Sequence, residues 1–168
     1  ELAAGLAYWA SGFRVLPGEF AASSDSGTPP GEALARWPIV PPERRRAGFL
    51  TDAVAALDGE PDFVAALAEV DFERQAPGDL LSEICAEAAG LYLANPSARI
   101  AYLHGVTGPA ALRLLAGQLD IPLFRRGVAY AFQSLAALHA TSSAAAPPSR
   151  LEPVSEGSLP AWDELRYR

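Results

Sequence analysis

Apolar residues recur at intervals of three and four along most of this 168-residue chain, and prolines and glycines interrupt the pattern. The first such stripe consists of Leu2, Leu6, Trp9, Phe13 and Leu16. This spacing places apolar side chains on one face of an α-helix. No stretch alternates apolar and polar residues as a half-buried strand does, and alanine and leucine dominate the apolar positions. We therefore expect an all-α protein, an irregular multi-helix array with long loops rich in Pro, Ser and Gly.

Prolines and glycines also predict where the helices end. They are so dense between residues 19 and 42 that we expect a long loop there, with one helical turn near Ala33 to Trp37. A second loop is expected at residues 143–160 from its Ser, Ala and Pro content. Helices are expected over residues 46–57, from Pro61 to about residue 70, between Asp79 and Asn95, from residue 97 to 119 with one break, and after Pro122.

The break expected inside residues 97–119 lies at His104-Gly105-Val106-Thr107-Gly108. Two glycines so close together favour a turn of the backbone. Pro109 suits the first position of a new helix, with Thr107 or Gly108 as its N-cap. His104 then stands at a helix end after an apolar run, so we expect its imidazole to face a cavity. The residues alone also allow a hydrogen-bonded core histidine or a structural helix terminus, which is the commoner case.

The charge and the composition exclude several classes of partner. Thirteen basic and twenty acidic residues give a net charge of −7, which opposes nucleic-acid binding. No apolar run is long enough for a membrane span and no signal peptide is visible, so we expect a soluble, cytoplasmic protein without a membrane partner. The chain lacks methionine and lysine altogether. Without an initiator, residues 1–168 are expected to be a segment of one helical domain, truncated at both ends.

Motif spacing narrows the possible sites. Neither GxGxxG, a P-loop nor GxSxG occurs, so a local nucleotide site or a nucleophile elbow is not expected. Cys85 stands alone and is expected to be a packing residue. The two histidines are too far apart for a local metal site, although His104 could supply one ligand. We expect His139 to be structural, and the Glu83–Glu87 pair to be solvated rather than to bind a metal.

Residues 104–113 resemble the His-x-Val-Thr-x-x-x-Ala-Leu-Arg signature of the questin oxidase-like family. Residues 1–10 look like the family's mid-chain "LAY" helix. Residues 129–138 are similar to its Tyr-x-aromatic-Gln-x-x-Ala-Ala-Leu helix. The resemblance implies an all-helical, oxygen-dependent oxidoreductase of secondary metabolism, either a monooxygenase of the Baeyer–Villiger type or a ring-cleaving oxygenase. Its partners would be dioxygen and a small aromatic polyketide of the anthraquinone type, with NADPH as the reductant.

The resemblance also implies roles for individual residues. His104 would be catalytic and could be one ligand of a non-heme iron centre that residues outside this segment complete. Thr107, Tyr130 and Gln133 match family positions and would bind the substrate, while a structural role stays open for Tyr130 and Gln133. The family's further histidines and its His-x-x-Lys motif are missing here, and His139 stands where the family more often has an aromatic residue. We therefore expect this segment to be inactive by itself, and the sequence does not predict the oligomeric state.

Two other classes of function stay open. A helical interaction scaffold that has lost catalysis would suit the Pro- and Ser-rich loops and the acidic surface. A histidine-based hydrolase is disfavoured, because no serine or cysteine stands in a recognisable nucleophile setting.

Overall fold

The structure is a computed structural model that describes residue 3 and residues 13–20 and 27–143. Its α-helices are α2 (Pro30–Ala35), α3 (Leu50–Val54), α4 (Pro61–Ala68), α5 (Pro77–Ala94), α6 (Arg99–Leu115) and α7 (Ile121–Ser142). Short 3-10 helices are η1 (Pro42–Arg44), η2 (Ala55–Gly59), η3 (Pro96–Ala98) and η4 (Ala116–Gln118). Among the described residues there is no sheet, only an isolated bridge between Thr28 and Val70. The predicted all-α class is confirmed.

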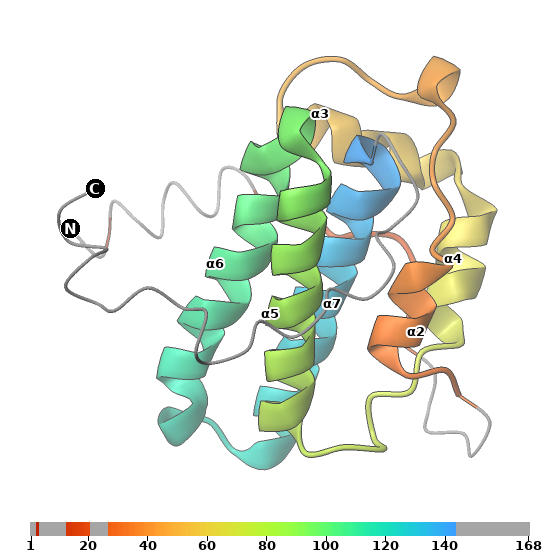
Figure 1. Cartoon of the computed structure of the whole chain (residues 1–168). Helices are drawn as coiled ribbons and strands as arrows, with labels where there is room; N and C mark the ends of the chain where they lie inside the picture. Colours follow the sequence, from red (N-terminus) through yellow and green to blue (C-terminus); the bar gives the residue numbers. More distant parts are fainter. Residues whose placement is uncertain (1–2, 4–12, 21–26, 144–168) are drawn as a thin grey trace, which may run out of the picture.

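The long helices α5, α6 and α7 pack against one another, and the shorter helices cover α7 and α5 from the other sides (Figure 1). The buried stripe of α5 contains Leu80, Ile84, Ala88 and Leu91. The buried stripe of α7 contains Val128, Phe132, Leu135 and His139. Both stripes have the spacing of three and four residues that is typical of a buried helix face. None of the described helices combines the length and the apolar character that crossing a bilayer requires.

Aromatic rings join the shorter helices to α7. Trp37 packs edge-to-face against Phe63 of α4 and against Phe132 of α7, with ring centroids 5.4 Å apart in both pairs. Phe132 makes a similar contact with Phe72, at 5.5 Å. Edge-to-face pairs of this kind add to the stabilisation that burial itself provides. The loop after α2 and the loop after α4 are thereby fixed on the same core helix.

Residues 19–42 contain more helix than the sequence predicted. Helix α2 begins at Pro30 and ends before Trp37, whereas one turn was expected near Ala33 to Trp37. A carboxylate from α5 caps it: the Gly31 N–H donates to Oε1 of Glu83 over 3.0 Å, and Nε2 of Gln75 donates to Oε2 over 3.3 Å. The prediction that Glu83 is merely solvated was therefore wrong. A carboxylate at a helix start replaces the partners that the first N–H groups lack.

Arginine side chains secure the connecting loops in a similar way. Arg125 of α7 donates from Nη1 to the carbonyl oxygens of Phe72 and Gln75, and its Nε lies 3.2 Å from the carboxylate of Glu73. The link between α4 and α5 is therefore held against α7. Arg45 similarly donates to the carbonyl of Val40 over 2.8 Å.

Helix α6 runs without interruption from Arg99 to Leu115, so the predicted break at residues 104–108 is wrong. Thr107 is not an N-cap, since its hydroxyl donates to the Leu103 carbonyl one turn earlier, over 3.0 Å. Pro109 lies inside the helix and is buried. Gly105 serves packing instead of a turn. A Cβ at this position would lie 2.6 Å from Leu135 Cδ1 and 3.4 Å from Ala88 Cβ.

We predict that Gly105→Ala destabilises the fold by about 1–3 kcal/mol, because the new methyl group would overpack the contact with a fully buried leucine. Gly108→Ala is the matched control on the same helix. A Cβ there meets no atom within 4 Å, so the higher helix propensity of alanine should stabilise by up to about 1 kcal/mol. Urea unfolding monitored by circular dichroism measures both. Equal effects of the two substitutions would contradict the packing role of Gly105.

Candidate functional site

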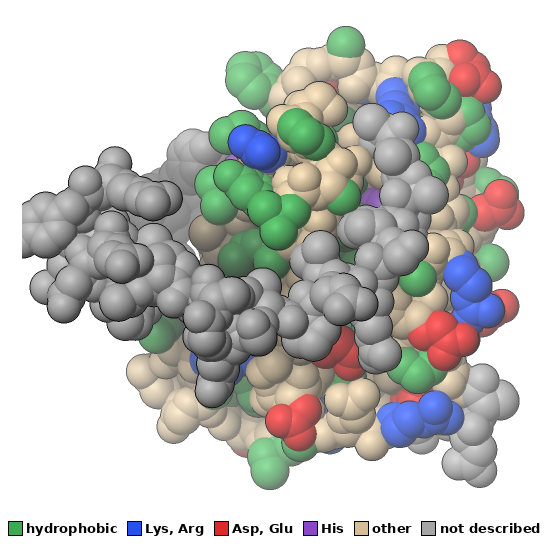
Figure 2. Space-filling view, in the orientation of Figure 1, with side chains coloured by type: hydrophobic (Ala, Val, Ile, Leu, Met, Phe, Trp, Pro, Cys, Tyr) green, Lys and Arg blue, Asp and Glu red, His purple; other side chains and the backbone are tan. Residues whose placement is uncertain are grey.

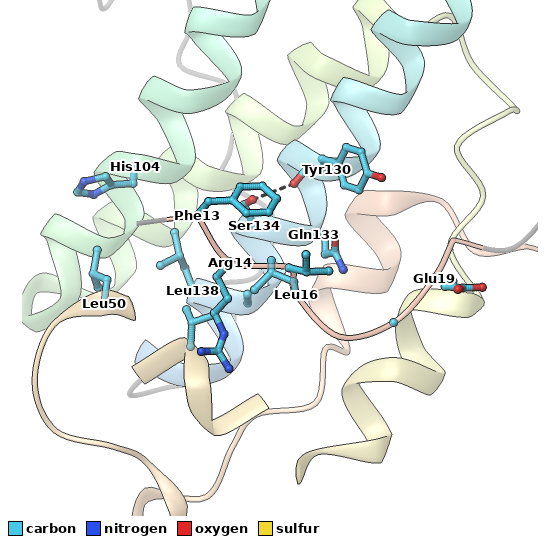
Figure 3. A pocket seen from close by; sticks show the side chains of 14 residues that line it. Phe13, Arg14, Leu16, Glu19, Leu50, His104, Tyr130, Gln133, Ser134 and Leu138 are labelled. Carbon is cyan, nitrogen blue, oxygen red and sulfur yellow. Dashed lines mark hydrogen bonds between the residues drawn. The ribbon is translucent and has the colours of Figure 1, made fainter. Parts of the chain in front are cut away.

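A cavity of about 1050 Å³ lies between the segment 13–19, α3, α6 and α7, and one side of it is open (Figure 3). Most of its lining is apolar, with side chains from Phe13, Leu16, Leu50, Ala137 and Leu138. The polar side chains at its wall are those of Arg14, Glu19, His104, Tyr130, Gln133 and Ser134. A mostly apolar hollow with a few polar groups is the usual form of a small-molecule site.

His104 lines this cavity and is otherwise exposed. It lies within α6 and not at a helix end, which corrects the predicted position. Its Nδ1 is 2.6 Å from the carbonyl oxygen of Ile100. A carbonyl only accepts, so Nδ1 carries the proton and a neutral ring has its lone pair at Nε2. That nitrogen can accept a proton or bind a metal.

Three of the four residues that the resemblance implies for the site line the cavity, but their polar atoms differ in availability. The carboxamide of Gln133 is buried, and its Nε2 donates to the Pro17 carbonyl over 3.1 Å, so it holds the cavity wall. Tyr130 is half exposed, and its hydroxyl points away from His104 (Figure 3). Thr107 is not part of the lining. Of the three that line the cavity, Gln133 is engaged by Pro17 and the Tyr130 hydroxyl points away, so His104 is the candidate for chemistry.

Residues 13–19 form one wall of the cavity, and the sequence did not predict that this segment lies near His104. Arg14 in this segment pairs with Asp58 of η2. Gly18 has a φ of 96°, which favours glycine, and a Cβ there would lie 3.0 Å from Leu67 Cδ2. Phe20 packs edge-to-face on Tyr130, with centroids 5.3 Å apart. These contacts join residues distant in the chain, and no local spacing could have predicted them.

His139 differs from His104 in its burial. It is fully buried in α7, and its Nδ1 is 3.0 Å from the hydroxyl of Tyr102, which is also fully buried. Its Nε2 is enclosed and has no hydrogen-bond partner among the described residues. Burial lowers the pKa of His139 from 6.5 to about 4. Burial likewise raises the pKa of Tyr102, against smaller opposing effects of Ser143 and Arg45. The pair is therefore neutral near pH 7.

The described residues contain no group of three histidine, cysteine, aspartate or glutamate side chains that could hold a metal ion. His104 alone cannot form an iron centre, because such a centre needs several protein ligands.

No protein-family model, curated protein or solved structure matches this chain. The likeness to questin oxidase-like proteins therefore stays a prediction, based on the residues around His104 and in α7.

We predict that acid destabilises the fold through His139. In the unfolded chain this imidazole binds a proton near pH 6.5, whereas in the folded protein it does so only near pH 4. The unfolded state thus holds more protons between these values, and the stability that is complete above pH 6.5 falls as the pH approaches 4. The loss should reach about 3 kcal/mol.

Urea unfolding at several pH values between 4 and 8 measures this loss. His139→Asn should be less stable than the original at pH 8 but should show a smaller decline on acidification, since the buried titrating group is gone. Tyr102→Phe is the control, because it removes the hydrogen bond and keeps the buried imidazole. If the His139→Asn profile declined as steeply as the original, His139 would not be the group responsible.

Proposed function

We propose that this chain is part of an oxygen-dependent oxidoreductase, similar to questin oxidase, that oxidises or cleaves an aromatic polyketide of the anthraquinone type. The cavity beside His104 would bind the aromatic compound. The size and apolar lining of the cavity support the binding of a flat aromatic molecule. The position of His104 in the family-like segment supports the choice of reaction.

The hydrogen bond from His104 Nδ1 to Ile100 is the observation that carries the proposal. It fixes the tautomer, so that Nε2 of a neutral ring carries the lone pair, and His104 is one of the residues that line the apolar cavity. In this position Nε2 would accept the proton of a phenolic hydroxyl: the O–H bond breaks, the proton goes to Nε2, and the electron pair stays on the phenolate oxygen. A phenolate is richer in electrons than the phenol and reacts more readily with dioxygen.

Each other side chain has a more limited role in this proposal. Phe13, Leu50 and Leu138 would contact the faces and edges of the aromatic rings and exclude water from them. Gln133 would act by keeping the wall at Pro17 in place. The complete reaction would also use NADPH and iron, and further ligands of the iron would lie outside the described residues.

We predict that 1,8-dihydroxyanthraquinone binds in the cavity and that its absorption band shifts to longer wavelength as the bound phenol loses its proton to His104. Absorbance titration at pH 7 measures binding and ionisation together. His104→Gln should leave a bound compound with the spectrum of the neutral phenol, because an amide cannot take up the proton. His139→Asn should leave the shift unchanged, since that ring lies outside the cavity. Identical shifts with His104→Gln and the original chain would exclude His104 as the base.

Oxygen consumption with the same compound tests the reaction itself. In a form of the protein that turns the compound over, His104→Gln should lower the rate about a hundredfold or more, as the loss of a general base does. Binding with a normal spectral shift but no oxygen consumption in any form of the protein would contradict the oxidoreductase and leave a binding protein.

A further inference from the structure

Helix α6 has a second apolar stripe on the face that points away from α5 and α7. We call this stripe the outer seam, and it consists of Ile100, Leu103, Thr107, Ala110 and Leu114. All five residues are exposed, with exposed fractions of 68% for Ile100, 44% for Leu103 and 81% for Leu114. Figure 2 shows hydrophobic side chains gathered over the side of the molecule where Figure 1 places α6.

The opposite face of α6 is buried through Ala101, Tyr102, Gly105 and Pro109. The helix is therefore apolar on both sides, and such a helix is normally buried on both sides. The outer seam also has the alternating spacing of three and four residues that forms the contact line of paired helices. Small side chains at Thr107 and Ala110 lie between the large ones at Leu103 and Leu114. This arrangement lets a second helix approach closely in the middle of the seam.

The charges beside the outer seam decide which helix fits. Arg99 and Arg113 flank it on one margin, and α6 contains no acidic residue. Both arginines are held toward α5: Arg99 lies 5.5 Å above the ring of Tyr92, and Arg113 donates to the hydroxyl of Ser82 over 2.7 Å. Charges at these flanking positions set partner choice and orientation between paired helices.

A second copy of α6 would not satisfy these charges. In an antiparallel pair centred on Thr107, Arg99 of one copy would lie beside Arg113 of the other, and like charges repel. In a parallel pair, Arg99 would face the partner copy's His104 and still find no carboxylate. A helix with glutamate or aspartate along the margin that faces Arg99 and Arg113 would be attracted in either orientation, antiparallel or parallel.

We propose that the outer seam docks an amphipathic α-helix of a partner protein, with apolar residues on the seam and acidic residues opposite Arg99 and Arg113. The proposal does not depend on the oxidoreductase function, because it uses a different face of α6 and none of its outer-seam residues lines the cavity.

Two synthetic peptides of about 21 residues test the charge requirement. Both carry leucine at the seam positions and alanine or glutamine elsewhere, and they differ only at the flanking margin, which is glutamate in one and lysine in the other. Fluorescence anisotropy, at concentrations where each peptide is monomeric by sedimentation, measures binding to the whole chain. The glutamate peptide should bind about tenfold more tightly than the lysine peptide. High salt should reduce this ratio.

Three variants locate the contact. The double substitution Arg99→Glu with Arg113→Glu should reverse the preference between the two peptides. Leu114→Asn should weaken the binding of both, and Leu93→Asn is its matched control, because Leu93 is also exposed (59%) but belongs to α5. The thermal unfolding of each variant shows whether it is folded. Leu114 is mostly exposed, so its substitution should leave the melting temperature unchanged.

Several results would overturn the proposal. Equal affinity for the two peptides, or binding of neither, would exclude an acidic partner helix. A stable dimer that Leu114→Asn dissolves would show that a second copy occupies the seam. A lowered melting temperature of Leu114→Asn, together with no peptide binding, would show that another part of the same chain covers it.

Discussion

Helices α5, α6 and α7 meet at Gly105, and this contact determines which faces of α6 are buried and which are exposed. A Cβ at this position would lie 2.6 Å from Leu135 Cδ1 of α7 and 3.4 Å from Ala88 Cβ of α5, so a glycine suits this contact best. This contact fixes the rotation of α6 about its own axis. His104 precedes Gly105 and lies about one hundred degrees from it around the helix axis. It is therefore turned away from the helix contact and lines the cavity. The same rotation turns Leu103 and Leu114 outward. The position of the imidazole and the exposure of the outer seam thus follow from one packing contact.

Polar groups from the long helices determine where the loops lie. Glu83 of α5 caps α2, Arg125 of α7 binds the carbonyl groups of the α4–α5 link, and Gln133 of α7 holds the segment at Pro17. Each of these bonds joins residues at least fifty positions apart and replaces partners that water would otherwise supply. Residues 13–19 form one wall of the cavity and are not helical. The side chain of Gln133, on the core helix α7, therefore holds this wall in place.

The sequence predicted the helical class, because regular spacing of apolar residues directly reflects which helix face is covered, as the buried stripes of α5 and α7 show. It failed at residues 104–108 because a glycine has two uses. Gly105 was interpreted as a turn, whereas it permits close packing, and no local pattern separates these uses. The roles of Glu83 and Gln133 were likewise beyond sequence reasoning, since their partners, Gly31 and Pro17, are brought to them only by the fold.

The two histidines show why burial by itself is a poor guide to a reactive group. His139 has the strongly lowered pKa that often marks functional sites, yet its ring is enclosed and one nitrogen is engaged by Tyr102. His104 uses Nδ1 for a backbone carbonyl, and its exposed side chain is among those that line the cavity. A substrate can reach only the second arrangement. Of the two imidazoles, only that of His104 is exposed to a dissolved molecule, and a single hydrogen bond within α6 sets its orientation.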